Sequence, residues 1–324
     1  MTDEIIRAAK ILKQGGLVAF PTETVYGLGA CGFDKNAVAR IFEVKKRPHF
    51  DPLILHIDDT KWLEKIASHV PSKARELTET FWPGPLTIVL PKLPVVPDIV
   101  TAGLPSTAVR MPANDIALGL IKKACCPIAA PSANTFGRIS PTRAVHVKEQ
   151  LGKNIETIID GGPCSVGIES TIVSFTTNTP MLLRPGGLEK EEIEKIIGPL
   201  IVPQKEKLSS LSPGRCEQHY SPVTPLLLCT STEEISKEQK SGLLSFTPID
   251  REKVPSNVVS TEILSSKGDL REAACNLFAA MRRLDSLGLD IIYALPIPST
   301  GLGMAINDRL SRASAKRAAQ KLNA

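Results

Sequence analysis

Two short segments of the chain carry side chains suited to holding a polyphosphate. Lys45-Lys46-Arg47-Pro48 supplies cations, and Ser132-Ala133-Asn134 supplies a hydroxyl and an amide. The sequence has no Walker-type phosphate loop, so a bound phosphate would depend on side-chain charge and hydrogen bonds. The pattern indicates a nucleotide enzyme of an unusual kind. The structural alternatives are a helix end closed by basic residues for the first segment and an ordinary strand-loop-helix, with Thr142 as N-cap, for the second.

Two other positions could bind an anionic or polar substrate. Pro21-Thr22-Glu23-Thr24 follows a buried strand predicted at 17–20, and open α/β sheets bind ligands at strand ends. A polar turn is the alternative. Arg110 stands among apolar residues in a strand predicted at 107–111. An inward arginine there needs an anionic partner, such as a substrate carboxylate, whereas a solvated arginine at a sheet edge does not.

The glycines Gly27-x-Gly29-x-x-Gly32 match the spacing of a dinucleotide-binding fingerprint. That fingerprint requires a tight turn from a strand into a helix. Here residues 21–26 separate the strand from the first glycine, and helical periodicity resumes only near Lys35. We therefore predict a chain-reversing loop rather than an NAD site.

The elements that would position these residues alternate between strands and helices. Strands are predicted at 17–20, 53–57, 86–90, 107–111, 128–130, 157–159, 171–175 and 181–183. Several have no helix between them, which favours a mixed sheet. We predict three parts: an α/β catalytic domain at 1–200, a linker or lid at 201–222 rich in Pro and Ser, and a smaller α/β domain at 223–324 that contains a long helix capped by Asp269.

The composition and the N-terminal residues argue against a membrane, secreted or strongly nucleic-acid-binding protein. The 324 residues are 23% charged and 42% hydrophobic, with no apolar run near the ~20 residues of a membrane span. The acidic N-terminus lacks a secretory signal, so a cytoplasmic protein is expected. A net charge of +5 permits weak contact with tRNA but is too small to indicate a nucleic-acid binder. The five histidines lack ligand spacing, and no dedicated metal site is expected.

Taken in order, the motifs of the chain resemble those of the threonylcarbamoyl-AMP synthase family. The segments are Pro-Thr-Glu-Thr-Val-Tyr-Gly-Leu-Gly (21–29), Lys-Lys-Arg-Pro (45–48), Trp-Pro-Gly-Pro-Leu-Thr (82–87), Val-Arg-Met-Pro (109–112), Ala-Pro-Ser-Ala-Asn (130–134), Glu-Ser-Thr-Ile (169–172) and Leu-Arg-Pro-Gly (183–186). Ser-Pro-Gly (212–214), His-Tyr-Ser-Pro (219–222) and Ser-Thr-Gly-Leu-Gly (299–303) resemble the long form with an added C-terminal domain.

The resemblance implies a twisted mixed-sheet YrdC-like domain followed by a smaller Rossmann-like α/β domain. It implies synthesis of threonylcarbamoyl-AMP and pyrophosphate from ATP, L-threonine and bicarbonate, with Mg²⁺ accompanying ATP. The product would feed the downstream machinery that transfers threonylcarbamoyl to the tRNA adenosine next to the anticodon. The rival interpretations are an RNA-binding or tRNA-associated module without catalysis and a carbamoyl-transfer enzyme. The first would need a basic stripe, whereas the basic residues of this sequence are dispersed or directed at a pocket. The second normally carries acylphosphatase-like and zinc-finger modules, and the sequence has no Cys-x-x-Cys pair.

The resemblance also assigns individual residues. ATP would contact Lys45, Arg47, His49, Ser106, Ser132, Asn134, Ser140, Arg184 and Tyr220, and Lys45 and Arg47 would act in catalysis. Threonine would be surrounded by Thr22, His56, Arg110, Ala130 and Ser170. In the linker, Cys216 and Glu217 replace residues that are often basic and aromatic in the family, so contacts with ATP are not assigned there.

Overall fold

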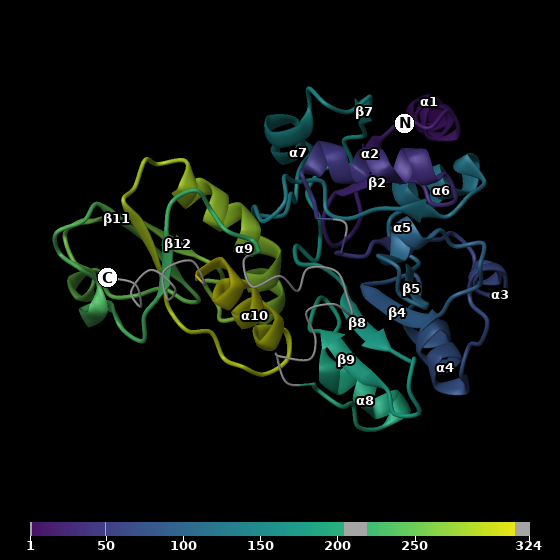
Figure 1. Ribbon diagram of the computed structural model, residues 1–324. Helices are drawn as coiled ribbons and strands as arrows, with labels where there is room; N and C mark the ends of the chain where they lie inside the picture. The colour runs from purple at the N-terminus through teal and green to yellow at the C-terminus, as the bar shows by residue number, and fades with distance from the viewer. Residues whose placement is uncertain (1, 49, 204–218, 315–324) are drawn as a thin grey trace. The chain divides into compact units, whose positions relative to one another are not determined.

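The structure, a computed structural model, describes residues 2–48, 50–203 and 219–314. The chain divides into two compact units (Figure 1). The first comprises Met1–Phe136 and Pro141–Arg215, and the second comprises Gly137–Ser140 and Cys216–Ala324. Most of the predicted linker, residues 204–218, lies outside the described residues.

The first unit is built on a mixed sheet. In the part of the chain that the structure describes, this sheet has 9 strands in the order β7-β1-β2-β6-β3-β5-β4-β8-β9. The strands are β1 (Val18–Phe20), β2 (Gly27–Cys31), β3 (Ile54–His56), β4 (Leu86–Pro91), β5 (Ser106–Arg110), β6 (Ile128–Ala129), β7 (Thr157–Ile158), β8 (Thr171–Ser174) and β9 (Met181–Arg184). The pairs β1–β7, β3–β5 and β4–β8 are parallel and the other pairs are antiparallel. The predicted mixed α/β fold is confirmed.

Helices border this sheet and bury apolar side chains against it. They are α1 (Thr2–Lys13), α2 (Lys35–Lys45), α3 (Leu63–Ile66), α4 (Ser72–Phe81), α5 (Asp98–Thr101), α6 (Asp115–Ala124), α7 (Ala144–Leu151) and α8 (Lys190–Ile197). Leu12 of α1 and Leu120 of α6 meet Phe20 and Ile128 of the sheet in one buried cluster. Among the described residues of both units, no helix combines the length and apolar composition needed to cross a membrane.

The glycine segment that we predicted to be a chain-reversing loop is mostly strand: Gly27 and Gly29 lie in β2, and Gly32 lies in the turn that follows. The prediction is therefore wrong for the first two glycines. Close packing explains why glycine occupies a strand here. A Cβ on Gly29 would lie 2.7 Å from Cγ2 of Ile128 and 2.8 Å from Cε1 of Phe20. Since only a residue without a side chain permits this approach, the glycines let β2 lie against β1 and β6.

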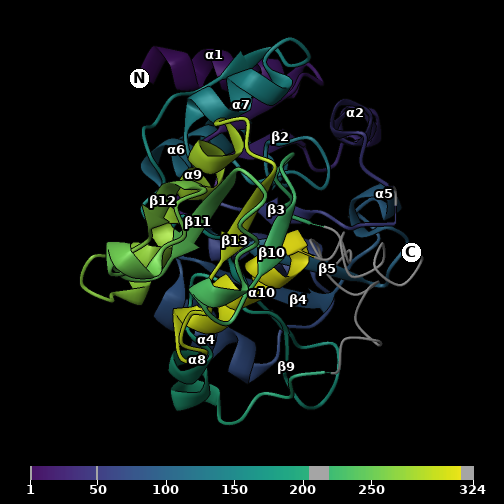
Figure 2. The same ribbon diagram turned by 90° about the vertical axis from the view of Figure 1, so that its left-hand side faces the viewer.

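The second unit contains a parallel sheet with the order β10-β13-β11-β12, seen side by side in Figure 2. Its strands are β10 (Leu226–Leu228), β11 (Ser241–Ser245), β12 (Val258–Ile263) and β13 (Ile291–Ala294). The helices α9 (Leu270–Asp285) and α10 (Leu302–Ser314) contact each other and the strands. This is the smaller Rossmann-like α/β domain that the sequence predicts.

Helix α9 begins at the predicted cap. The side chain of Asp269 accepts hydrogen bonds from the backbone N–H groups of Arg271 and Glu272, at 2.6 and 3.1 Å. The carboxylate of Glu272 does not close a capping box, because it accepts a hydrogen bond from the hydroxyl of Ser265 at 2.5 Å. That hydroxyl oxygen in turn accepts from the N–H of Asp269 at 2.9 Å, so Ser265 completes the cap.

A four-residue loop, Gly137–Ser140, belongs to the second unit although its flanking residues belong to the first. The N–H of Ser221 donates to the carbonyl of Gly137 at 2.8 Å. The guanidinium of Arg282, in α9, donates to the carbonyl of Ile139. The loop is therefore held by two segments that are distant from it in the sequence.

Candidate functional site

Helix α2 ends at the first of the predicted phosphate-binding segments. Its last residue is Lys45, and Lys46 follows in the left-handed conformation with φ of 53°. The N–H of Lys46 donates to the carbonyl of Glu43, and that of Arg47 donates to Phe42 at 2.9 Å. These bonds satisfy the last carbonyls of the helix and turn the chain sharply, so Lys45 and Arg47 lie on either side of a tight cap.

Lys45 points inward and joins this helix end to the second predicted segment. The residue is 1% exposed. Its ammonium donates to the carbonyl of Ser132 at 2.6 Å and to the carbonyl of Asn134. Burial, reinforced by the nearby charge of Arg47, lowers the pKa of Lys45 well below the usual range, while Asp51 acts in the opposite direction. We call Lys45, Ser132 and Asn134 the lysine cluster.

Arg47 is buried beside this cluster and bound to its own loop. Its Nη2 atom lies 2.8 Å from a carboxylate oxygen of Asp51, with both side chains almost fully buried. Nε and Nη2 also donate to the carbonyls of Asp51 and Pro52, at 3.2 and 3.0 Å respectively. An anion that binds Arg47 must therefore share the guanidinium with Asp51.

The segment that carries Ser132 and Asn134 is fixed by backbone pairing. Ser132 forms an antiparallel bridge with Gly27, and the N–H of Ala133 donates to the carbonyl of Tyr26 at 2.8 Å. The side-chain amide of Asn134, a residue 1% exposed, donates to the carbonyl of Thr135 at 2.8 Å. The glycine-rich strand thus positions the second predicted segment.

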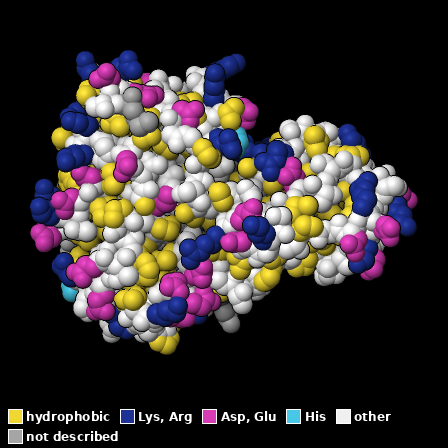
Figure 3. All heavy atoms as spheres, turned by 180° about the vertical axis from the view of Figure 1, so that it is seen from behind, with side chains coloured by type: hydrophobic (Ala, Val, Ile, Leu, Met, Phe, Trp, Pro, Cys, Tyr) yellow, Lys and Arg dark blue, Asp and Glu magenta, His cyan; other side chains and the backbone are white. Residues whose placement is uncertain are grey.

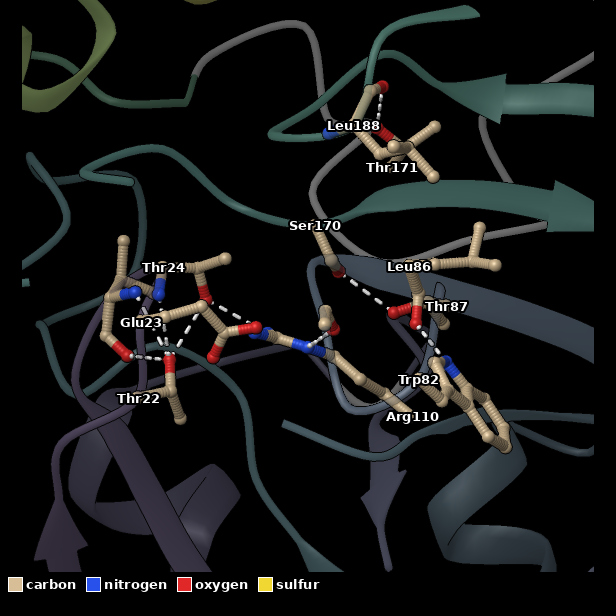
Figure 4. A network of polar contacts seen from close by, with 12 residues as sticks. Thr22, Glu23, Thr24, Trp82, Leu86, Thr87, Arg110, Ser170, Thr171 and Leu188 are labelled. Atoms are coloured by element: carbon tan, nitrogen blue, oxygen red, sulfur yellow. Dashed lines mark hydrogen bonds and ion pairs between the residues drawn. The ribbon is translucent and has the colours of Figure 1, made fainter. Parts of the chain in front are cut away.

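A second polar cluster surrounds the guanidinium of Arg110 at the end of β5 (Figure 4). Its Nη1 donates to the hydroxyl oxygen of Thr24 at 2.8 Å, and its Nε donates to the carbonyl of Gly84 at 3.2 Å. Its Nη2 lies 2.6 Å from a carboxylate oxygen of Glu23, and the side chains of Arg110 and Glu23 are only 4% and 6% exposed. The hydroxyl of Thr22 donates to the carbonyl of Val25 at 2.7 Å and lies 2.8 Å from the hydroxyl of Thr24. Thr22, Glu23, Thr24 and Arg110 form the arginine cluster.

His56 stands next to Arg110, because the parallel register of β3 and β5 pairs these two residues. Its ring meets that of Phe20 edge-on, with centroids 6.0 Å apart. Burial, and then the charge of Arg110, lower the pKa of His56 to about 3. The imidazole is therefore neutral near pH 7 and adds no positive charge to the arginine cluster.

Ser170, which the resemblance assigns to threonine, contacts Arg184, which the resemblance assigns to ATP. The hydroxyl of Ser170 forms a hydrogen bond of 2.7 Å with the hydroxyl of Thr87. Nη2 of Arg184 donates to the carbonyl and to the hydroxyl of Ser170, at 2.9 and 3.2 Å. The residue predicted to bind ATP and the one predicted to bind threonine therefore touch, because β9 pairs with β8 just beyond Ser170.

The remaining predicted site residues are more scattered. The N–H of Ala130, which is 3% exposed, donates to the carbonyl of Ile54 at 3.0 Å. Ser106 begins β5, at the opposite end of the strand from Arg110. Ser140 and Tyr220 are fully buried in the second unit, where the ring of Tyr220 stacks on Phe278 with centroids 5.5 Å apart. His49 lies outside the described residues.

In the sequence, Glu23 is one carboxylate in a candidate polar turn, and nothing there indicates a role for it. The sequence also indicates no role for Asp51 or Thr87, which contact Arg47 and Ser170. The available signal for Glu23 was the prediction that a buried Arg110 needs an anionic partner. Nothing in the spacing of two residues so far apart in sequence indicates that they pair.

A metal ion held by protein ligands alone needs a group of several ligating side chains. Among the described residues, no group of three or more His, Cys, Asp or Glu side chains could hold a metal ion. Mg²⁺ that accompanies a nucleotide differs, since phosphates and water supply most of its ligands. The hydroxyl and amide oxygens of the lysine cluster are of the hard type that Mg²⁺ accepts.

Comparison with known proteins agrees with the fold and the motifs. A family model described as "Telomere recombination" matches residues 10–186, and one described as "Threonylcarbamoyl-AMP synthase, C-terminal domain" matches residues 188–315. The threonylcarbamoyl-AMP synthase of Pyrococcus abyssi is 45% identical over 96% of this chain and 94% of its own length. That of Bacillus subtilis is 43% identical over 97% and 94%.

Among solved structures, the P. abyssi protein Sua5 complexed with L-threonine superposes with a TM-score of 0.91 at 43% identity, covering 98% of this chain and 96% of that chain. The resemblance drawn from the motifs is confirmed over both units. The chain belongs to the threonylcarbamoyl-AMP synthase family, with both its N-terminal domain and its C-terminal domain.

Proposed function

We propose that this chain makes threonylcarbamoyl-AMP from L-threonine, bicarbonate and ATP, releasing pyrophosphate, and that the arginine and lysine clusters carry the reaction. The observation that carries the proposal is the buried guanidinium of Arg110 at a strand end, where it contacts the hydroxyl of Thr24 and the carboxylate of Glu23. Such a guanidinium suits the carboxylate of an amino acid. Because Arg184 contacts Ser170, the residues that would bind the nucleotide and those that would bind threonine adjoin each other.

The chemistry needs positioning more than a protein nucleophile. The amine nitrogen of threonine forms a bond to the carbon of bicarbonate, from which water leaves, and this gives a carbamate. An oxygen of the carbamate then attacks the α-phosphorus of ATP. That O–P bond forms as the bond to the bridging oxygen breaks, and pyrophosphate leaves. Lys45 and Arg47 would neutralise the phosphate charge, and Arg110 would hold the carboxylate in place. Because ATP brings negative charge to a lysine with a depressed pKa, its binding is expected to favour the charged ammonium.

Mg²⁺ would bind with the triphosphate of ATP, and Ser132 and Asn134, whose hydroxyl and amide oxygens are hard ligands, would complete its coordination. When bound, the ion supplies charge neutralisation at the phosphates. Arg47 and Lys45 would hold the same phosphates from the protein side.

We also propose that the product is used in the cytoplasm by the machinery that modifies tRNA, with at most weak tRNA contact by this chain. On the face of the molecule that Figure 3 shows, Lys and Arg side chains are interspersed with Asp and Glu. A nucleic-acid binder usually gathers its basic residues into a stripe. The charge distribution on this face therefore favours an enzyme over an RNA-binding module.

The proposal is tested by incubating the purified full chain with ATP, Mg²⁺ and bicarbonate, with and without L-threonine. Pyrophosphate release and the mass of any adenylate are measured together. We expect release that depends on threonine and an adenylate with the mass of threonylcarbamoyl-AMP. Release without threonine, or ATP binding with no release under any condition, would contradict the proposed reaction.

A further inference from the structure

The structure points to a role for Glu23 that goes beyond its pairing with Arg110. We infer that Glu23 recognises the ammonium group of the amino-acid substrate, so that it and Arg110 together select a zwitterion. The inference rests on the proposed function, since it concerns the site where L-threonine would bind.

The backbone around Glu23 is fixed, so its side chain is held in place. The hydroxyl oxygen of Thr22 accepts hydrogen bonds from the N–H groups of Thr24 and Val25, both at 3.2 Å, which closes a tight turn. The carbonyl of Glu23 accepts from the N–H of Val166 at 2.7 Å. Figure 4 shows the side chain extended from this turn toward Arg110.

The hydroxyl groups of the cluster donate away from Glu23. Because Thr22 gives its proton to the carbonyl of Val25, the hydroxyl of Thr24 is the donor to Thr22. Thr24 in turn accepts from Arg110. This chain of donors uses both hydroxyl protons and leaves none for the carboxylate.

The carboxylate of Glu23 has unused capacity for hydrogen bonds. Its side chain is 6% exposed, and neither oxygen has a hydrogen-bond partner among the described residues. The 2.6 Å approach of Arg110 is an ion pair without the alignment of a hydrogen bond. An ionised carboxylate accepts about four hydrogen bonds, and a buried one left without donors is costly. A hydrogen-bond donor on a ligand would supply the partner that the carboxylate of Glu23 lacks.

The charges of Arg110 and Glu23 determine which ligand can bind in the arginine cluster. A carboxylate that approaches Arg110 comes close to the like charge of Glu23, which is unfavourable unless a cation accompanies it. His56 cannot supply that cation, since it is neutral near pH 7. An α-amino acid brings its ammonium two bonds from its carboxylate and so supplies both charges. An α-hydroxy acid supplies only the anion, and the cluster should reject it.

The experiment compares two ligands by calorimetry on the full chain: L-threonine and the 2,3-dihydroxybutanoate of the same configuration, in which a hydroxyl replaces the amine. The wild type should bind threonine more tightly than the analogue. Glu23→Gln should weaken threonine binding by about ten- to a hundredfold, the effect of losing a charge-assisted hydrogen bond. The same variant should bind the analogue as well as the wild type does, or better, because Arg110 is released. A folded state is verified by thermal unfolding.

The control is Glu156→Gln, which neutralises a carboxylate paired with Arg40 in the same unit. It should leave threonine binding unchanged. If Glu23→Gln weakens the binding of both ligands equally, Glu23 only orients Arg110 and the inference is wrong. Unchanged threonine binding by this variant would also refute the inference. If the wild type binds another α-amino acid but not threonine, and Glu23 is required, the proposed substrate is wrong while the inference stands. If it binds no α-amino acid, both are wrong.

Discussion

Replacing Lys45 by methionine should remove activity while leaving the fold intact. The ammonium donates to two carbonyls, and hydrogen bonds from a charged group contribute about 1.5–3 kcal/mol each. Burying that charge costs several kcal/mol, and methionine fills a similar volume with apolar atoms. The opposing terms nearly cancel, so the free energy of unfolding should change by less than about 2 kcal/mol.

The effect on turnover should be much larger. Removing one group that stabilises developing charge in a transition state typically lowers kcat by about 10²–10³-fold, or roughly 3–4 kcal/mol. The assay is pyrophosphate release with all substrates saturating, beside a urea unfolding curve for each variant. Lys73→Met is the control, since Lys73 also donates to a carbonyl, that of Ile197 at 2.7 Å, on a different side of the same unit. A folded Lys45→Met protein with turnover within about threefold of the wild type would refute the reasoning.

The depressed pKa of Lys45 adds a second readout. Below the ordinary value of 10.5 the unfolded chain binds a proton that the folded chain resists, so burial of Lys45 lowers the stability of the wild type as the pH falls from that value. Lys45→Met should remove this dependence. Parallel stability curves for the two proteins between about pH 10 and pH 7 would show that Lys45 does not carry a shifted pKa.

Two further predictions concern stability. Because the pKa of His56 falls from 6.5 to about 3, the unfolded chain gains a proton at pH 5 that the folded chain refuses, which destabilises the wild type by about 2 kcal/mol relative to pH 8. His56→Gln should reduce this acid dependence in urea unfolding, and an unchanged slope would contradict it. Gly29→Ala should destabilise the protein by about 1–3 kcal/mol through the clash with Ile128 and Phe20. In contrast, Gly119→Ala, in a helix with no contact nearer than 3.5 Å, should be neutral or stabilising in the same assay.

Most elements of the fold could be predicted from local pattern alone. The strands expected at 86–90 and 107–111 are found at Leu86–Pro91 and Ser106–Arg110, because runs of β-branched and apolar residues mark buried strands. The strand at Gly27–Cys31 could not, since glycine is a poor strand former in isolation. Glycine is needed at position 29 because Phe20 and Ile128, in a strand about a hundred residues later, leave no room for a Cβ.

In the candidate site, too, the sequence predicts which residues matter but not which residues they contact. The sequence indicated that Arg110 needs an anion and that a carboxylate stands at the end of the first strand, yet it did not pair them. It marked Lys45 as a phosphate ligand but did not predict the carbonyls that Lys45 holds. These partners depend on which strands become neighbours, and local spacing carries no such information.

The loop Gly137–Ser140 has a consequence for the order in which the chain can assemble. Domains generally fold as they leave the ribosome, the N-terminal one first. This loop emerges early, but its partner Arg282 is made 143 residues after Ile139. Folding in strict order along the chain therefore cannot complete the loop. We expect its backbone to become protected from hydrogen exchange only after α9 has been synthesised and folded.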